Sequence, residues 1–302
     1  MRKQFIEEIC SEKGIEKEEI SYGWISILKK GKIQKKLVNY NFQLNPKIAI
    51  ELAKDKYSTY EVLTYYGIPI VEHQVLFNQK MMPSFETSQP NEILKNDKKQ
   101  VIKANNSLQG KDVYVCQDRA RKIQLVQELF EKEIEAVVVC PYLDIEYEYR
   151  AIFLAGEMIY LYKKQKPFVI GDGKSTIQEL VEKQVSYLEE PIEGLDFARI
   201  PQKGKKVMVG WKHNLSKGAI PVLIDCHDAY YEKVRNIAIQ AGNALELKFA
   251  SVDVVVTKEK KVCVIEVNSR VCIHKFCELA PNGMAIGKEI YAKVIDKMLE
   301  EV

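Results

Sequence analysis

The sequence predicts an α/β (α+β) protein with two subdomains and a short N-terminal module. The chain has 302 residues, enough for about two domains of ordinary size. Short apolar runs typical of strands alternate with segments of helical periodicity, which is the pattern of mixed α and β layers. Hydrophobic residues make up 46% of the chain, so the protein can bury a sizeable core.

The charge composition excludes several classes of protein. Lys and Arg number 45 against 42 Asp and Glu, a net charge of +3, and the two signs are interspersed. A dedicated nucleic-acid-binding protein would show a basic footprint, and the basic stretch from Lys29 to Lys36 is short and lacks interleaved aromatic residues. No apolar run approaches the ~18 residues that cross a membrane, and no signal peptide is visible after Met1. We therefore expect a cytoplasmic protein with no nucleic-acid or membrane partner.

The seven cysteines form no regular framework, which is typical of free thiols in a reducing compartment. Cys272, His274 and Cys277 place potential zinc ligands close together. Structural zinc sites usually have four ligands, and the sequence offers no matching pair elsewhere. We therefore do not expect zinc.

Residues 1–50 are expected to form the N-terminal module. Apolar runs at 24–28 and 37–40 flank a basic turn at Gly31, a pattern that predicts a β-hairpin. Pro46 is expected at the first position of a helix. Residues 51–85 are expected to link this module to the next subdomain.

The linking segment carries clear helix signals. Lys56 is expected to open a helix directly after Asp55, and Gly67 suits the left-handed position that ends it. Ile68 precedes Pro69, so the chain should leave the helix extended.

Residues 86–143 predict a small α/β lid subdomain. Its expected elements are strands at Gln100 to Lys103, Val113 to Cys116 and Ala136 to Cys140, with an amphipathic helix at Gln117 to Glu133. Residues 144–302 are expected to form the larger C-terminal subdomain. Its expected helices lie near 176–184, 229–243 and 284–300.

A group of oxygen ligands is expected at the last hairpin. If Thr257 pairs with Val262, the register places Asp253 directly opposite Glu266, with Cβ atoms about 5 Å apart. Asn268 shares the face of Glu266. Carboxylates this close repel unless a cation lies between them, and hard oxygen ligands suit Mg²⁺. The alternative is a solvated hairpin face neutralised by lysines, and the spacing alone does not decide between the two.

Three further segments could meet an anion. Lys103 ends a predicted strand and precedes a small polar loop, although the loop has a single glycine, Gly110, and no Walker sequence occurs. The turn at 171–176 precedes a helix and is better explained as a structural cap by Ser175 or Thr176. The polar loop at 213–218 could hold an anion, but that signal is weak alone.

Taken in order, these pieces resemble the ATP-grasp superfamily, and most closely the ATP-grasp module of cyanophycin synthetase and of fused glutathione synthetases. The resemblance runs from about Asp55 to Leu299. The segments that carry it are Asp55-Lys56, Gly67-Ile68-Pro69, Val101-Ile102-Lys103, Glu148-Tyr149-Arg150, the Gly171-Asp172-Gly173 turn with its helix, Asn214-Leu215-Ser216, Val252-Asp253 and Glu266-Val267-Asn268-Ser269-Arg270, followed by His274 and Gly283.

The resemblance implies the ATP-grasp fold, in which a lid subdomain (86–143) and a C-terminal catalytic subdomain (144–302) clasp ATP. The implied cofactors are ATP and Mg²⁺, with Mn²⁺ as a substitute. The implied cofactor-binding residues are Lys56, Lys103, Val139, Cys140, Tyr142, Leu143, Glu146, Glu148 and Lys164. The implied metal ligands are Asp253, Glu266 and Asn268, and the implied catalytic residues are Arg150, Asn214, Ser216 and Arg270.

The activity implied by the resemblance is the ATP-dependent joining of a carboxylate to an amine through an acyl phosphate. The substrates would be small molecules or peptides that carry these groups, such as an amino acid or a peptide end. A catalytically weak ATP-binding regulatory protein and an ATP-grasp phosphotransferase are the alternatives. A homodimer is favoured by the resemblance alone.

The sequence also departs from the family pattern. The lid loop at 105–110 keeps one glycine, and Cys140 stands where an acid is usual in the hinge. Lysine replaces an arginine before the Gly-Asp-Gly turn, and Trp211-Lys212 stands where an arginine precedes the Asn-Leu-Ser loop. Because Arg and Lys bind phosphate differently, these changes put lid kinetics and acceptor preference in doubt.

Overall fold

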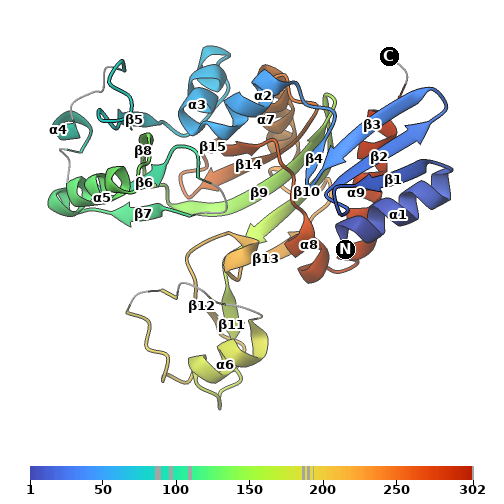
Figure 1. Ribbon diagram of the computed structural model, residues 1–302. Helices are drawn as coiled ribbons and strands as arrows, with labels where there is room; N and C mark the ends of the chain where they lie inside the picture. The colour runs from blue at the N-terminus through green and yellow to red at the C-terminus, as the bar shows by residue number, and fades with distance from the viewer. Residues whose placement is uncertain are drawn as a thin grey trace.

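The computed structural model describes residues 1–85, 90–94, 98–107, 111–185, 188, 191–192 and 194–300. Within those ranges the strands form four sheets (Figure 1). Among the same residues, no helix is both long and apolar enough to cross a membrane.

The N-terminal module is a helix, α1 (Arg2–Lys13), packed on an antiparallel sheet of β1 (Glu16–Ile20), β2 (Ile25–Lys30), β3 (Ile33–Val38) and β4 (Asn41–Phe42). The expected hairpin is confirmed as β2–β3, with Gly31 at positive φ in its turn. Helix α1 and strand β1 were not predicted. The buried residues of α1, among them Phe5 and Ile9, share one core with the C-terminal helix α9 (Gly283–Met298), so the first and last helices of the chain pack together.

Two helices follow the module. The first, α2 (Lys47–Lys54), starts one residue after Pro46, which is its extended N-cap and not its first helical residue. The second, α3 (Lys56–Tyr65), starts at Lys56 as expected, because the Asp55 carboxylate accepts the backbone N–H of Ser58 at 2.6 Å. Gly67 takes the predicted left-handed conformation after the helix, with φ of +68°.

The lid sheet has the order β5-β8-β6-β7, and every pair in it is antiparallel. Its strands are β5 (Gln74–Phe77), β6 (Gln100–Ala104), β7 (Val113–Cys116) and β8 (Ala136–Pro141). Helix α5 (Arg119–Glu131) packs on one face, and Ile93 and Leu94, at and just after the end of the short α4 (Pro90–Ile93), join the same core. The strand β5 comes from within the segment 51–85, so part of that segment belongs to the lid sheet.

The central sheet has the order β13-β10-β9-β14-β15. Its strands are β9 (Ile145–Leu154), β10 (Glu157–Gln165), β13 (Ile220–Leu223), β14 (Phe249–Thr257) and β15 (Val262–Asn268). One face is apolar along its length and packs against α2 and α7 (Tyr231–Ala244). The opposite face is apolar only at the end next to the N-terminal module and becomes charged toward the lid.

The β14–β15 pairing confirms that Asp253 lies opposite Glu266, although by a different route from the expected one. Val256, and not Thr257, pairs with Val262, while the Thr257 N–H donates to the Lys261 carbonyl at 2.9 Å. A β-bulge then adds one residue on β15. Val254 pairs with Val264, whereas Asp253, the residue before Val254, pairs with Glu266. The turn shifts the pairing by one residue from the expected register, and the bulge shifts it back, so the expected Asp253–Glu266 pair forms.

A small unit extends from the central sheet between β10 and β13 (Figure 1, bottom). It consists of β11 (Phe168–Ile170), β12 (Lys206–Met208) and α6 (Ile177–Gln184) around a core of its own. Thr176 caps α6 in a reciprocal capping box with Glu179, as the turn sequence predicted. The chain then returns through a single 3₁₀ turn (Leu215–Lys217), and α8 (His274–Leu279) precedes α9.

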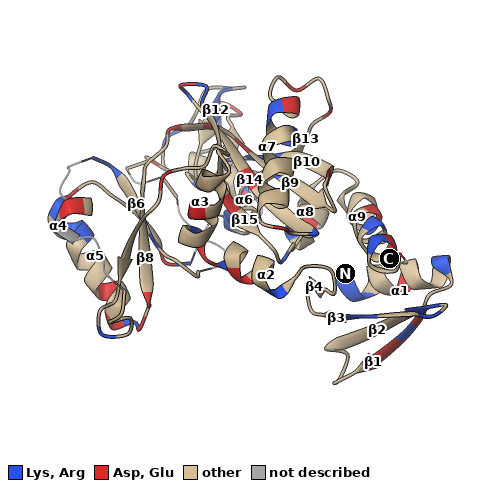
Figure 2. Cartoon of the chain, turned by 90° about the horizontal axis from the view of Figure 1, so that it is seen from above, with Lys and Arg blue, Asp and Glu red and all other residues tan. Residues whose placement is uncertain are grey.

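Charged residues of both signs occur along the backbone of these units (Figure 2). In the N-terminal sheet, for example, acidic β1 lies beside the basic β2, and Lys29 pairs with Glu18 at 2.6 Å. This mixed surface agrees with the near-neutral net charge.

Candidate functional site

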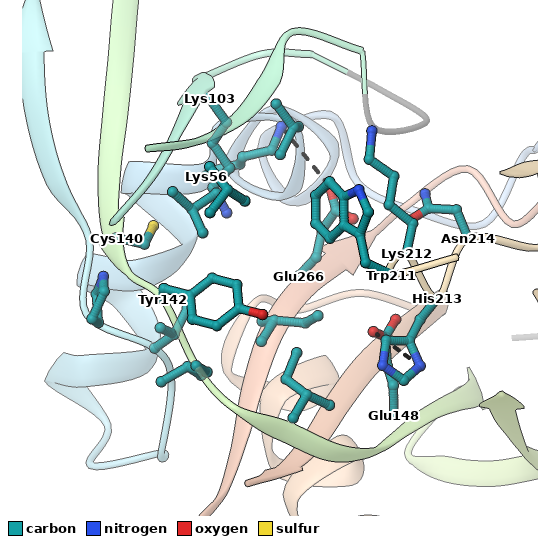
Figure 3. Close-up of a pocket in the computed structure, with 18 of the residues that line it drawn as sticks. Lys56, Lys103, Cys140, Tyr142, Glu148, Trp211, Lys212, His213, Asn214 and Glu266 are labelled. Atoms are coloured by element: carbon teal, nitrogen blue, oxygen red, sulfur yellow. Dashed lines mark ion pairs between the residues drawn. The ribbon is translucent and has the colours of Figure 1, made fainter. Parts of the chain in front are cut away.

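A pocket with a cavity volume of about 210 Å³ lies between the lid sheet and the charged part of the central sheet (Figure 3). Most of it is built by the lid strands β6 to β8, the central strands β9 and β15, and the loop at 211–214, and Lys56, Val71 and Lys166 come from other parts of the chain. The residues that line it are Lys56, Val71, Val101, Lys103, Ser107, Val113, Val115, Cys140, Pro141, Tyr142, Leu143, Ile145, Glu148, Lys166, Trp211, Lys212, His213, Asn214, Ile265 and Glu266.

One end of the pocket is apolar. There the chain passes from β8 into β9 through Cys140, Pro141, Tyr142 and Leu143, and lid valines form the facing wall. Cys140 is buried, and burial raises the pKa of its thiol, so the thiol stays protonated and neutral. This end can accept a flat, weakly polar ring.

The other end of the pocket is cationic. Lys56 is only 8% exposed, and its ammonium donates to the carbonyl oxygens of Asn105 (3.1 Å) and Ser107 (2.6 Å). Glu266 lies 3.8 Å from the same ammonium. Burial lowers the pKa of Lys56 to about 8. Lys103, near the end of β6, adds a second ammonium, so this end suits a multiply charged anion.

A buried network of charges lies beneath the pocket on the central sheet. Arg150 on β9 faces Asp253 on β14 and donates to both carboxylate oxygens, at 2.8 and 2.7 Å. Lys164 on β10 lies 3.1 Å from Asp253 and also pairs with Glu148. Burial raises the pKa of Asp253, but the guanidinium of Arg150 and the ammonium of Lys164 outweigh it and lower this pKa to about 2.

This network bears on the predicted metal ligands. Glu266 lines the pocket and is 32% exposed, and Asn268 lies on the same face of β15, opposite Ser251. Both oxygens of Asp253, however, are bonded to cations and its side chain is only 3% exposed, so Asp253 is not open to a metal ion in this arrangement. Among the described residues, no three His, Cys, Asp or Glu side chains gather closely enough to hold a metal. Glu266 and Asn268 are therefore the available part of the predicted set.

The structure brings many of the predicted site residues together. Those that line the pocket are Lys56, Lys103, Cys140, Tyr142, Leu143, Glu148, Asn214 and Glu266. Arg150 and Lys164 lie in the charge network beneath it, with Asp253 between them. Ser216 lies in the 3₁₀ turn after Asn214, and Arg270 is exposed just beyond β15.

Ser216, Asn268 and Arg270 are not among the residues that line the pocket. Two other predicted residues, Val139 and Glu146, lie away from it for simple geometric reasons. Val139 points into the lid core with Val137, because alternate residues of β8 face opposite sides and Cys140 takes the pocket side. Glu146 does not line the pocket, and its carboxylate pairs instead with Lys260, at 2.5 Å, in the turn after β14. Part of the glycine-poor lid loop, residues 108–110, lies outside the described residues.

Several pocket residues were not assigned from the sequence. Lys166 lines the pocket beyond the end of β10, and burial lowers the pKa of its ammonium. His213 and Trp211 enter from the loop that returns from the small unit. The polar loop at 213–218 is a partial signal for them, because His213 begins this loop and Trp211 lies just before it. Nothing in the pattern placed that loop against the lid.

Comparison with protein families and curated proteins supports one family. Residues 206–298 match the model described as the RimK-like ATP-grasp domain. The bifunctional glutathione biosynthesis protein GshAB of Clostridium perfringens is 27% identical over 157 residues, which cover 43% of this chain and 20% of that protein. GshAB of Streptococcus thermophilus is 26% identical over 237 residues, 68% of this chain and 31% of that protein. The chain thus spans about a third or less of these relatives.

Solved structures share the fold. A bifunctional glutathione synthetase from Pasteurella multocida has a TM-score of 0.58 at 18% identity, covering 94% of this chain and 43% of that one. A D-alanine–D-alanine ligase from Bacillus anthracis has a TM-score of 0.57 at 17% identity, covering 84% of this chain and 69% of that one. The same ligase is also known in complex with ATP. The chain therefore has the ATP-grasp fold, and its residues 206–298 are similar to the RimK-like ATP-grasp domain.

Proposed function

We propose that this protein is an ATP-dependent ligase that joins a carboxylate to an amine, with an amino acid or a peptide as substrate. The observation that carries the proposal is the pocket between the two sheets, which is apolar at the hinge and cationic at Lys56 and Lys103. This polarity matches a nucleotide, whose base is flat and weakly polar and whose phosphates are anionic.

In this proposal the residues of the pocket have distinct roles. The connection at Cys140 to Leu143 binds the adenine, and Lys56 and Lys103 bind the phosphates. Asn214 and Ser216 lie beside the transferred phosphate and the acceptor, and Arg150 and Arg270 stabilise negative charge that develops there. Lys164, which is bonded to Glu148 and Asp253, fixes the floor of the site.

The available oxygen donors, Glu266 and Asn268, would hold Mg²⁺, with Asp253 joining them if it releases one of its cations. These oxygen ligands fit a hard divalent ion that keeps water and phosphate oxygens in its shell. When bound, Mg²⁺ neutralises charge on the phosphates during transfer.

The chemistry balances without a nucleophilic side chain. A carboxylate oxygen of the first substrate attacks the γ-phosphorus, and the bond to ADP breaks to give an acyl phosphate. The amine of the second substrate attacks the acyl carbon, inorganic phosphate leaves, and the amine loses a proton. The protein supplies positioning and a closed site that keeps water from the acyl phosphate.

The proposal can be tested by measuring ADP release from Mg·ATP with pooled amino acids and dipeptides, with hydroxylamine as a surrogate amine. Hydroxamate formed with one pool would identify the carboxylate substrate. Glu266→Gln should abolish this turnover. Glu146→Gln is the matched control, because Glu146 lies outside the pocket, and it should remain active. ATP binding without ADP release above background in any pool would contradict the ligase assignment.

One observation favours a second candidate, an ATP-binding regulatory protein with little turnover. Asp253 is bonded through both oxygens to Arg150 and Lys164, so the predicted metal set is not assembled. In this case ATP should bind in the absence of Mg²⁺, and the Glu266→Gln variant should bind it as well as the wild type.

A further inference from the structure

Two buried histidines each leave one ring nitrogen without a partner. The Nε2 atoms of His213 and His73 are both buried and accept or donate no hydrogen bond. In each ring the other nitrogen lies 2.7 Å from a backbone carbonyl, that of Lys164 for His213 and that of Val71 for His73. A carbonyl can only accept, so Nδ1 carries the proton and Nε2 is left as a bare acceptor.

Of the two histidines, only His213 lines the main pocket, where it is 7% exposed. His73 lines a separate small void of about 10 Å³, together with Lys56. Burial lowers the pKa of His213, so the ring stays neutral. A buried acceptor without a donor is costly, and a ligand group that carries a proton would satisfy it.

The surroundings of His213 limit which ligand group this can be. Its neighbour Glu148 lies 4.0 Å from Nδ1, and the Glu148 carboxylate is already paired with Lys164. Figure 3 places both side chains on the wall away from Lys56 and Lys103. A phosphate has no proton to donate at neutral pH, and Glu148 would repel it. A hydroxyl group is neutral and can donate.

We propose that His213 selects for the sugar of the bound nucleotide, with Nε2 accepting a hydrogen bond from a ribose hydroxyl. This inference rests on the proposed function, because it takes the ligand to be ATP. His213 is thus a specificity-determining residue that favours ribonucleotides over deoxyribonucleotides.

The test compares the binding of ATP, 2′-deoxyATP and 3′-deoxyATP by isothermal titration calorimetry with Mg²⁺ present and no carboxylate or amine substrate, so that no ligation occurs. The wild type should bind ATP about five- to tenfold more tightly than the analogue that lacks the hydroxyl bonded to His213. This factor is the effect of losing a single hydrogen bond. His213→Phe should weaken ATP binding by the same factor and leave the affinity for that analogue unchanged. The variant should therefore no longer distinguish ATP from the analogue. His73→Phe removes the other unpartnered ring and should keep the wild-type ratio.

Different failures lead to different conclusions. If His213→Phe weakens all three nucleotides equally, His213 is structural and the ribose assignment is wrong. If the wild type binds all three with equal affinity, the assignment is wrong whether or not the Phe variant folds. If the wild type binds none of them, the proposed nucleotide site is wrong as well.

Discussion

Replacing Asp253 with asparagine should destabilise the protein strongly, although the two side chains have nearly the same volume. The carboxylate is 3% exposed and neutralises the guanidinium of Arg150 and the ammonium of Lys164. In the buried network of Arg150, Lys164, Glu148 and Asp253, two positive charges balance two negative ones. The amide keeps the shape but leaves one positive charge uncompensated.

The expected loss follows from two independent arguments. Breaking a buried ion pair by removing one partner costs about 3–5 kcal/mol. The fall in the pKa of Asp253 from 3.8 to about 2 corresponds to about 2 kcal/mol of stabilisation of the charged form. We therefore expect a loss of about 3 kcal/mol, which for a chain of 302 residues lowers the melting temperature by about 5 °C.

The assay is thermal unfolding at pH 7 in EDTA, followed by circular dichroism. Asp144→Asn is the matched control, because Asp144 pairs with Lys258 at 2.6 Å but is 60% exposed. Exposed pairs contribute about 0–1 kcal/mol, so this variant should melt within about 3 °C of the wild type. Equal effects of the two substitutions would refute the reasoning that burial makes the Asp253 network important.

The same variant predicts a pH dependence with a definite sign. The pKa of Asp253 in the folded state, about 2, is lower than that of an aspartate in the unfolded chain, about 3.9. Its stabilising contribution is therefore present above about pH 4 and is lost as the pH falls toward 2. The difference in stability between the wild type and Asp253→Asn should shrink when unfolding is measured in denaturant below pH 4. A difference that stays constant from pH 7 to pH 3 would contradict this assignment.

Three further predictions concern other parts of the molecule. Lys103→Met should weaken ATP binding by about 10- to 100-fold, the value of a charge-assisted hydrogen bond, and calorimetry would measure it; an unchanged affinity would remove Lys103 from the phosphate site. Gly242→Ala should cost about 1–3 kcal/mol by overpacking, since an added Cβ would lie 2.7 Å from the ring of Phe153; a melting temperature equal to that of the wild type would contradict this. Thr176→Ala should cost about 1 kcal/mol by removing the capping box with Glu179, and Thr176→Ser, which keeps the hydroxyl, should cost less.

Local signals in the sequence predicted much of the secondary structure. Asp55 before Lys56 and Gly67 after the helix set the two ends of α3, because a cap and a left-handed residue act within a few positions. Helix α1 escaped prediction for the opposite reason. Its buried face is complete only when α9, nearly 280 residues later in the chain, packs against it.

The sequence predicts the positions of those site residues that depend only on the residue type and on the register of two neighbouring strands. Asp253 was placed opposite Glu266, and Lys56 and Lys103 were singled out as the ends of elements. The pocket side of β8 was not resolved, so Val139 was grouped with Cys140 although alternate residues of a strand face opposite sides. The bulge that preserves the Asp253–Glu266 pairing also had no sequence signal of its own.

The sequence by itself determined the class of fold, the order of its pieces and the residue types available to bind a nucleotide, because periodicity, caps and motifs are local properties of the chain. The tertiary structure alone decided which of those side chains are free. It paired Asp253 with Arg150 and Lys164, turned Glu146 toward Lys260, and brought His213 to the pocket with an unpartnered nitrogen. Hydrogen bonds and ion pairs depend on distances of a few ångströms between residues far apart in sequence, and only packing of the sheets sets those distances.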